Sequence, residues 1–189
     1  MASSSSEASW RSDASALIVA AELGKGDFAW LDALRRHHYP SERDRVPAHL
    51  TLFRSLPPSA GEEVRRSLSR ACAAAPPDAE ISGIMDLDSG VALRIASPEL
   101  EDIRDELAAE FRGLLTAQDQ GRWTPHVTIQ NKVEPGEARK LLREMRASFE
   151  ARAIEIAGLQ LIRYVEGEWE AVGRFAFRGP RSARQRRRS

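Results

Sequence analysis

The sequence has little cysteine, lacks long apolar runs and carries no excess of either charge. Cys72 is the single cysteine among 189 residues, so no disulfide can form within the chain, as expected in a reducing cytoplasm. Lysine plus arginine and aspartate plus glutamate each number 28, so no field of the whole protein attracts nucleic acid. No apolar run is long enough to cross a membrane, and the N-terminal residues contain no apolar segment of a secretory signal. We therefore expect a cytoplasmic protein without a membrane partner.

The two ends of the sequence differ in composition from the segment between them. Residues 1–15 are rich in serine, and residues 179–189 are rich in arginine. Neither end has the apolar periodicity of a packed helix or strand, and we expect both to be disordered tails. Residues 16–178 have the length of one domain, or of two small lobes that share a core. Apolar residues make up 42% of the sequence, which suffices for a globular core.

Two His-x-Thr motifs occur in nearly the same surroundings, at His49 and Thr51 and again at His126 and Thr128. Each motif lies in a short run of leucine, isoleucine, valine and phenylalanine, a composition typical of strands. Because side chains alternate along a strand, each histidine shares one face with its threonine, and the apolar neighbours point to the other face. A structural histidine would give the same local pattern, but the repeated context favours a functional pair.

Two histidines and two hydroxyl groups on open strand faces suit phosphoryl chemistry. One imidazole can take a proton from the attacking oxygen while the other protonates the leaving oxygen, because histidine ionises near neutral pH. The threonine hydroxyls can donate to non-bridging phosphate oxygens and stabilise the charge that develops there. This chemistry needs no metal and no nucleophilic side chain, and we expect no cofactor.

The expected secondary structure repeats in the order strand, helix, His-x-Thr strand, helix. The first strand and the motif histidine are separated by similar lengths in the two halves, from residue 17 to 49 and from residue 91 to 126. A duplicated unit with one motif per copy predicts two lobes that face each other across a cleft. Approximate two-fold symmetry would then bring both imidazoles to one phosphate.

Three local signals predict where helices begin. Asp27 is a suitable N-cap for a helix over residues 28–38. Ser59 and Glu62 have the spacing of a capping box. Ser97 precedes a proline at the first position of the next expected helix.

The sequence resembles the 2H (two-histidine) phosphoesterase superfamily and, within it, the 2′-5′ RNA ligase-like proteins. The resemblance is carried by both His-x-Thr motifs with their flanks, Arg45–Phe53 and Trp123–Lys132, and it extends over residues 17–178. It implies an α+β fold in which duplicated strand–helix units form two lobes, with antiparallel-rich sheets facing a central cleft. It also implies metal-independent opening of 2′,3′-cyclic phosphates on RNA ends or nucleotides, and some relatives join or cleave 2′-5′ linkages.

By this resemblance, His49 and His126 are the catalytic pair, and Thr51 and Thr128 bind phosphate. Which histidine is the base and which is the acid stays open, because the near-symmetry allows both assignments. The sequence departs from the family pattern at one position. Some RNA-processing relatives carry a basic residue soon after the second motif, where Gln130 stands here. Lys132 shares a face with His126 in an expected strand over residues 126–133, and we expect it to replace that basic residue as a phosphate contact or else to be solvated.

Further candidates flank the two motifs. Phe53 shares the expected open face of the first motif strand and can stack on a base, or it can cap the core at the strand end. Arg43 and Arg45 can bind further phosphates from a loop over the cleft, or they belong to an ordinary polar loop. Tyr39 and Tyr164 belong either to the site or to the packing around it.

The leading hypothesis is a cyclic phosphodiesterase whose partner is an RNA end or a small cyclic nucleotide, and we expect a monomer. One alternative is a binding module that holds RNA or nucleotides in the same cleft without turnover. A second alternative is a metallohydrolase that uses His37 and His38 together with the motif histidines. The sequence has no compact metal-ligand spacing to favour this second alternative.

Overall fold

The computed structural model describes residues 16–43, 46–165 and 168–180. The expected N-terminal tail and most of the expected C-terminal tail lie outside these residues. The described chain continues past the expected boundary at residue 179, since the N–H of Gly179 donates to the carbonyl of Ala74 at 2.9 Å.

A seven-stranded sheet forms the centre of the described structure, in the order β2-β1-β6-β3-β4-β5, with β7 paired to β6. All the strand pairs are antiparallel. The strands are β1 (Leu17–Leu23), β2 (Leu50–Leu56), β3 (Asp78–Asp86), β4 (Val91–Ala96), β5 (His126–Gln130), β6 (Arg152–Val165) and β7 (Glu168–Ala176). The helices are α2 (Lys25–His38), α3 (Gly61–Ala71), α4 (Pro98–Glu110), α5 (Ala117–Gln120) and α6 (Pro135–Ala147), with a short 3₁₀ turn, η1 (Pro58–Ala60).

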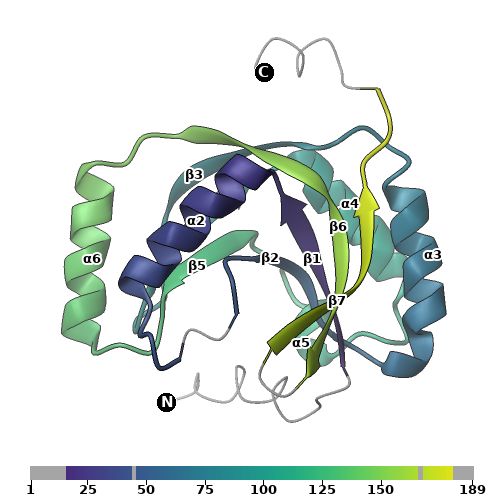
Figure 1. Cartoon of the computed structure of the whole chain (residues 1–189), viewed down its shortest axis with the longest axis horizontal. Coiled ribbons are helices and arrows are strands. Elements are labelled where there is room, and N and C mark those ends of the chain that lie inside the picture. Colours follow the sequence, from purple (N-terminus) through teal and green to yellow (C-terminus); the bar gives the residue numbers. More distant parts are fainter. Residues whose placement is uncertain (1–15, 44–45, 166–167, 181–189) are drawn as a thin grey trace.

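The long strand β6 joins the two lobes. Its first residues pair with β3, and the rest pairs with β1 on one edge and with β7 on the other. One half of the chain follows the order β1, α2, β2, α3 and the other follows β4, α4, β5, α6, with α5 inserted before β5. Figure 1 shows α6 and α3 on opposite sides of the molecule with the strands between them. The predicted α+β fold of duplicated units with antiparallel sheets is confirmed.

Helix α2 crosses from one lobe to the other. It follows β1 in sequence, yet it contacts β5, the second motif strand. Its buried Leu31 belongs to the main core, and its buried Arg35 reaches the backbone of β5. This contact fixes the two lobes against each other beside the motif residues.

The buried core consists of one large cluster and two small ones. Alternate residues of β1 point to opposite faces: Leu17 and Val19 belong to the large cluster, which includes residues of α3 and α4, and Ile18 and Ala20 belong to a small cluster that β1 shares with β6. Both faces of β1 are therefore apolar, which explains why its sequence is a continuous apolar run. Cys72 is buried in the large cluster, and burial raises the pKa of its thiol to about 11.

The three helix-start signals have different outcomes. The prediction for Ser97 is confirmed, since its side chain accepts from the N–H of Leu100 and caps α4. The prediction for Asp27 is wrong: α2 begins earlier, at Lys25, and the Asp27 carboxylate accepts from the N–H of Glu155 at 2.8 Å. The prediction of a capping box at Ser59 is also wrong, because Ser59 lies inside the 3₁₀ turn and α3 has no side-chain cap.

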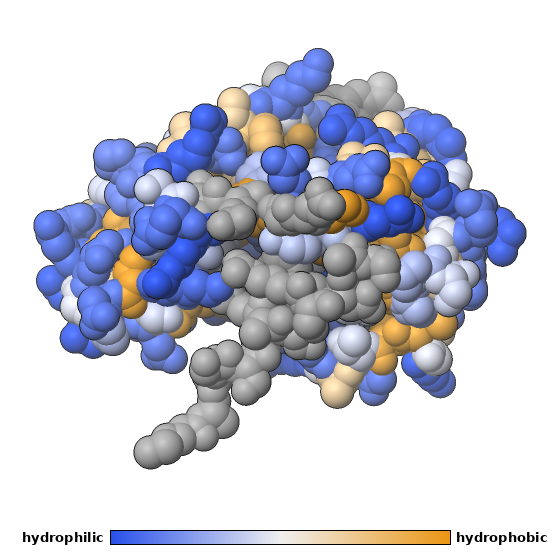
Figure 2. All heavy atoms as spheres, turned by 60° about the horizontal axis from the view of Figure 1, so that its bottom comes forward, coloured by the Kyte–Doolittle hydropathy of each residue, from blue (hydrophilic) through white to orange (hydrophobic). Residues whose placement is uncertain are grey.

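The surface shown in Figure 2 is predominantly hydrophilic, with apolar atoms in small separate areas. Charged residues make up 30% of the sequence, which accounts for this surface. Among the helices that the structure describes, none combines the length and apolar character needed to span a membrane.

Candidate active site

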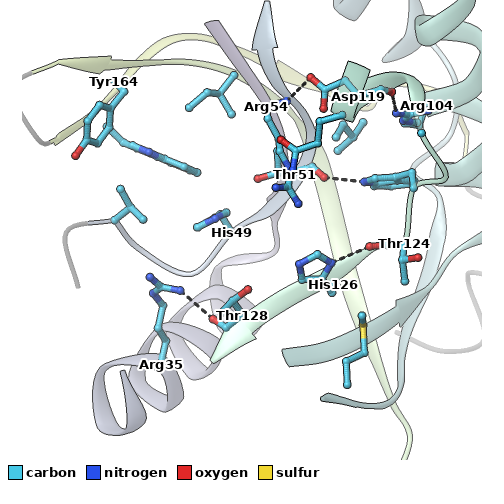
Figure 3. Close-up of a pocket in the computed structure, with 18 of the residues that line it drawn as sticks. Arg35, His49, Thr51, Arg54, Arg104, Asp119, Thr124, His126, Thr128 and Tyr164 are labelled. Atoms are coloured by element: carbon cyan, nitrogen blue, oxygen red, sulfur yellow. Dashed lines mark hydrogen bonds between the residues drawn. The ribbon is translucent and has the colours of Figure 1, made fainter. Parts of the chain in front are cut away.

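A cleft of about 360 Å³ contains both His-x-Thr motifs. Its walls come from both lobes and include β2, β5, α2 and the segment around α5. The lining residues that carry polar or aromatic groups are Arg35, Tyr39, Arg43, His49, Thr51, Arg54, Arg104, Gln118, Asp119, Arg122, Trp123, Thr124, His126, Thr128, Tyr164 and Trp169. Figure 3 shows His49 and His126 turned towards the same space.

Each motif histidine is held in the same way by the backbone two residues earlier. Nδ1 of His49 lies 2.7 Å from the carbonyl oxygen of Pro47, and Nδ1 of His126 lies 2.8 Å from that of Thr124. A carbonyl oxygen can only accept, so Nδ1 carries the hydrogen in both rings. This fixes the neutral tautomer and leaves Nε2 of each ring as the basic nitrogen available for a ligand.

The surroundings of both imidazoles lower their pKa and favour the neutral ring. The pKa of His49 is lowered to about 4, mainly by burial and to a smaller extent by the positive charges of Arg35 and Arg54, whereas the hydrogen bond to Pro47 acts in the opposite direction. Burial also lowers the pKa of His126, again with a contribution from Arg54. The electrostatic interaction of His126 with His49 reflects their proximity within one cleft.

The two motif threonines are anchored by their backbone carbonyls. The indole Nε1 of Trp123 donates to the carbonyl of Thr51 at 2.9 Å. The guanidinium of Arg35 donates to the carbonyl of Thr128 at 3.0 Å. Each anchor comes from another part of the fold, so each threonine is fixed on the half-buried wall of the cleft. Neither anchor has a sequence signal of its own.

Strand β2 is irregular directly after its motif. Five residues of β1 (17–21) pair with seven residues of β2 (50–56), with register shifts on either side of the pair Val19 and Phe53. Leu52 and Phe53 are consequently both buried, at 1% and 0% exposure, which regular alternation does not allow.

The prediction that Phe53 lies on the open face is therefore wrong. Its ring packs in the large core cluster, 5.5 Å from the ring of Phe111. The irregularity turns the next side chain, Arg54, into the cleft instead. Strict alternation from the histidine placed Arg54 on the core side, so sequence reasoning missed it.

The prediction that Lys132 shares a strand face with His126 is also wrong. Strand β5 ends at Gln130, and Lys132 has a positive φ of 63°, which places it in a turn. Lys132 is not among the residues that line the cleft. Gln130 itself is buried, and its amide donates to Glu137 of α6 at 3.2 Å.

The loop after α2 contributes one arginine to the cleft. Arg43 lines it, and its guanidinium donates to the carbonyl of Lys132 at 2.7 Å, which ties this loop to the turn after β5. Arg45 lies outside the described residues. The other two histidines, His37 and His38, are at the end of α2, where their rings meet edge to face, and neither lines the cleft.

Aromatic side chains form the wall beside His49. The ring centre of Trp169 lies 4.5 Å from that of the His49 imidazole, and Trp169 packs against the small core cluster to which Tyr164 belongs. Tyr39 also lines the cleft, where the guanidinium of Arg35 lies 3.9 Å from its ring centre. Tyr39 and Tyr164 therefore belong both to the cleft and to its packing.

The segment around α5 forms a polar wall of the cleft. Asp119 is only 4% exposed, and its carboxylate accepts from the N–H groups of Arg54 at 2.9 Å and Ser55 at 3.2 Å. Arg104 of α4 is also buried, and its guanidinium donates to the carbonyl of Asp119. Burial raises the pKa of the Asp119 carboxyl group, and the two N–H donors act in the opposite direction.

The cleft is strongly cationic although the whole sequence has no net charge. Its described lining contains five arginines and one carboxylate, that of Asp119. The arginines are Arg35, Arg43, Arg54, Arg104 and Arg122. An anionic ligand therefore suits the cleft, and the buried walls make its charge interactions stronger than in water. Within the described part of the chain, no three His, Cys, Asp or Glu residues are grouped so that they could hold a metal ion.

A protein-family model described as the 2′-5′ RNA ligase superfamily matches residues 25–168. The matched range includes both motifs and ends at the start of β7. A search of curated proteins finds no match to the sequence.

Solved structures share the fold at low sequence identity. TT0787 of Thermus thermophilus superposes with a TM-score of 0.62 at 17% identity, over 88% of this chain and 100% of that one. E. coli LigT complexed with NADP+ has a TM-score of 0.53 at 19% identity, over 86% of this chain and 98% of that one. E. coli LigT complexed with 3′-AMP has a TM-score of 0.51 at 17% identity, over 86% and 97%.

Proposed function

The chain belongs to the 2′-5′ RNA ligase superfamily, and from this membership we propose that it is a phosphodiesterase that opens 2′,3′-cyclic phosphates on RNA ends or nucleotides. The observation that carries the proposal is the matched pair of imidazoles. Each is locked through Nδ1 to a backbone carbonyl, and both lie in one cationic cleft. Two threonines complete the site.

The reaction we propose uses the two Nε2 atoms in opposite roles. One neutral imidazole takes a proton from a water molecule as its oxygen attacks phosphorus. The bond from phosphorus to the 2′ or the 3′ oxygen breaks, and the other imidazole, in its protonated form, gives that oxygen a proton. The product is a phosphomonoester beside a free hydroxyl. Thr51 and Thr128 donate to the non-bridging oxygens, where negative charge increases in the transition state.

The lowered pKa values of both histidines bear on this scheme. Near neutral pH the neutral form of both rings is favoured, because burial and the nearby arginines lower the pKa of each, and neither ring by itself is set to act as the acid. A bound phosphodiester brings a negative charge that favours an imidazolium beside it. Substrate binding is therefore expected to take up a proton, and the general acid forms together with the complex.

A nucleotide as the ligand has further support from the relatives. E. coli LigT is described in complexes with NADP+ and with 3′-AMP, both of which are nucleotides. The aromatic wall beside His49 offers this cleft a surface on which a base can stack. We propose no cofactor, and the roles of His49, His126, Thr51 and Thr128 form part of the proposal.

The test is a substrate panel assayed without added metal. It contains 2′,3′-cyclic nucleotides, RNA with a cyclic-phosphate end and 2′-5′ dinucleotides, each with wild-type protein, His49→Ala and His126→Ala. His37→Ala is the matched control, because His37 lies at the end of α2 and does not line the cleft. We expect turnover of a cyclic substrate that falls about a hundredfold or more in each motif variant and is unchanged in the control. Binding of nucleotides without any turnover would replace the enzyme with the binding-module alternative.

A further inference from the structure

Arg54 enters the cleft because of the irregularity in β2. β2 has two more residues than the stretch of β1 with which it pairs. Two consecutive residues, Leu52 and Phe53, are therefore buried, and the next residue, Arg54, lies on the same face as Thr51. Figure 3 shows Arg54 and Thr51 together, next to His49 and His126. A positive charge therefore lies on the same wall as the first motif.

The charge of Arg54 reaches both histidines. It lowers the pKa of His49 and the pKa of His126, whereas Arg35 acts on His49 and Arg94 acts on His126. Within the described residues, the guanidinium of Arg54 makes no hydrogen bond and no ion pair. Its N–H donors are therefore available for a ligand. This guanidinium lies near both imidazoles, its charge also acts on the Asp119 carboxyl group, and it is placed where the anionic group of a substrate is expected.

Asp119 holds the backbone of β2 at this point. Its carboxylate accepts from the N–H groups of Arg54 and Ser55, the two residues directly after the buried pair. Asp119 is itself fixed in α5, where its N–H donates to the Thr116 side chain and its carbonyl accepts from Arg104. The carboxylate thus replaces strand partners that the irregular backbone lacks, and it determines where the Arg54 side chain begins.

We propose that Arg54 is the cation that binds the reacting phosphate and stabilises its developing charge, and that Asp119 is the positioning residue that keeps Arg54 there. The inference rests on the proposed function for its phosphodiester substrate. An arginine suits this role because its planar fork can donate two parallel hydrogen bonds to phosphate oxygens. Arg54 has the phosphate-binding role that the sequence predicted for Lys132, and Lys132 does not line the cleft.

The first experiment compares Arg54→Gln and Arg54→Lys with wild-type protein. Arg66→Gln is the matched control, since Arg66 is an exposed arginine on α3 that does not line the cleft. Removing one donor to the developing charge is expected to lower kcat/KM about a hundredfold or more. Arg54→Lys keeps the charge without the fork and should recover part of this loss. Arg66→Gln should behave as wild type.

Two readouts of the same variants do not need turnover. Binding of inorganic phosphate, followed by NMR, should weaken about tenfold or more in Arg54→Gln. The pKa values of His49 and His126, followed through their ring protons, should both rise in Arg54→Gln and stay low in Arg54→Lys. Wild-type phosphate affinity together with unchanged histidine titrations in Arg54→Gln would overturn the inference. If that variant does not fold, Arg54→Ala takes its place, and unchanged phosphate affinity and unchanged histidine titrations in Arg54→Ala would overturn the inference as well.

The second experiment tests the positioning role of Asp119 with a double-mutant cycle. Asp119→Asn supplies a weaker acceptor for the two N–H groups. It should lower kcat/KM about tenfold, because the Arg54 guanidinium is then less well placed against the phosphate. In the Arg54→Gln background the same change should have little further effect, because the side chain that it positions is gone. Asp102→Asn, on the exposed face of α4, is the control. An equal loss in both backgrounds would show that Asp119 serves only stability.

These experiments separate the inference from the proposed function. If wild-type protein turns over none of the cyclic substrates, the proposed function fails, and phosphate affinity with the histidine titrations still decides whether Arg54 binds the anion. If wild-type protein and Arg54→Gln turn over the same substrate equally well, the proposed function stands and the role of Arg54 is refuted.

Discussion

The stability of the protein is predicted to fall on mild acidification because of His49. Its pKa in the folded state is about 4, against an ordinary 6.5, so below pH 6.5 the unfolded chain binds a proton that the folded chain does not. Stability from this residue is fully present above the unfolded value and is lost as the pH falls from 6.5 towards about 4. Stability falls on acidification because the folded protein favours the neutral ring of His49, whereas the unfolded chain binds the proton.

The size of the effect can be worked from the same values. The difference between about 4 and 6.5 corresponds to about 3 kcal/mol at the lower end of the range. Because the His49 ring is only partly buried and solvent screens part of the effect, we expect a measured loss of about 1–2 kcal/mol. That is a substantial part of the stability of an ordinary domain.

The assay compares wild-type protein with His49→Asn in urea unfolding, near pH 7.5 and again near pH 5, in buffers free of phosphate. Asparagine can keep the hydrogen bond to the carbonyl of Pro47 but cannot be protonated in this range. Wild-type protein should lose about 1–2 kcal/mol more than the variant between the two conditions. Added inorganic phosphate should reduce this difference, because an anion in the cleft favours the protonated ring. Equal losses in the two proteins would refute the reasoning.

Three further predictions concern the proposed reaction. The double variant of His49→Ala and His126→Ala should be little slower than the poorer single variant, because the two imidazoles act as a unit; an additive loss in kcat would contradict this. Thr51→Val or Thr128→Val should each lower kcat about tenfold to a few hundredfold, which steady-state assays would measure. Calorimetry of nucleotide binding in buffers of different ionisation enthalpy should show uptake of up to about one proton near neutral pH, and no buffer dependence would argue against the acid forming in the complex.

The motif strands could be predicted because their apolar neighbours and their repetition are properties of the sequence itself. The sequence therefore predicts His49 and His126 as a pair, and the duplicated order of elements predicts the architecture. The same alternation failed two residues after the first motif. β2 has two more residues than the stretch of β1 with which it pairs, and this makes the strand irregular. The sequence of β2 contains no glycine or proline that would indicate the irregularity.

The errors on Phe53 and Lys132 have one physical origin. Both residues were placed by extending the period of a strand beyond the point where the strand is regular. At Phe53 the register shifts, and at Lys132 the strand has already ended in a turn with positive φ. Asp119 and Arg104 were missed for a different reason, because their partners are backbone groups distant in sequence, and such partners leave no local pattern.

The balance of charge in the sequence also concealed the electrostatics of the site. A net charge of zero is compatible with a cleft whose described lining has five arginines and one carboxylate, because the acidic residues are mostly elsewhere. These arginines influence the protonation of the two imidazoles differently with and without a bound phosphodiester. Their charges lower the pKa of both imidazoles, and a bound phosphodiester would compensate those charges, so that one imidazole could accept the proton it needs. The arrangement thus links the protonation of the catalytic pair to the occupancy of the cleft, and neutralising Arg54 should weaken anion binding while it raises the pKa of both histidines in the free protein.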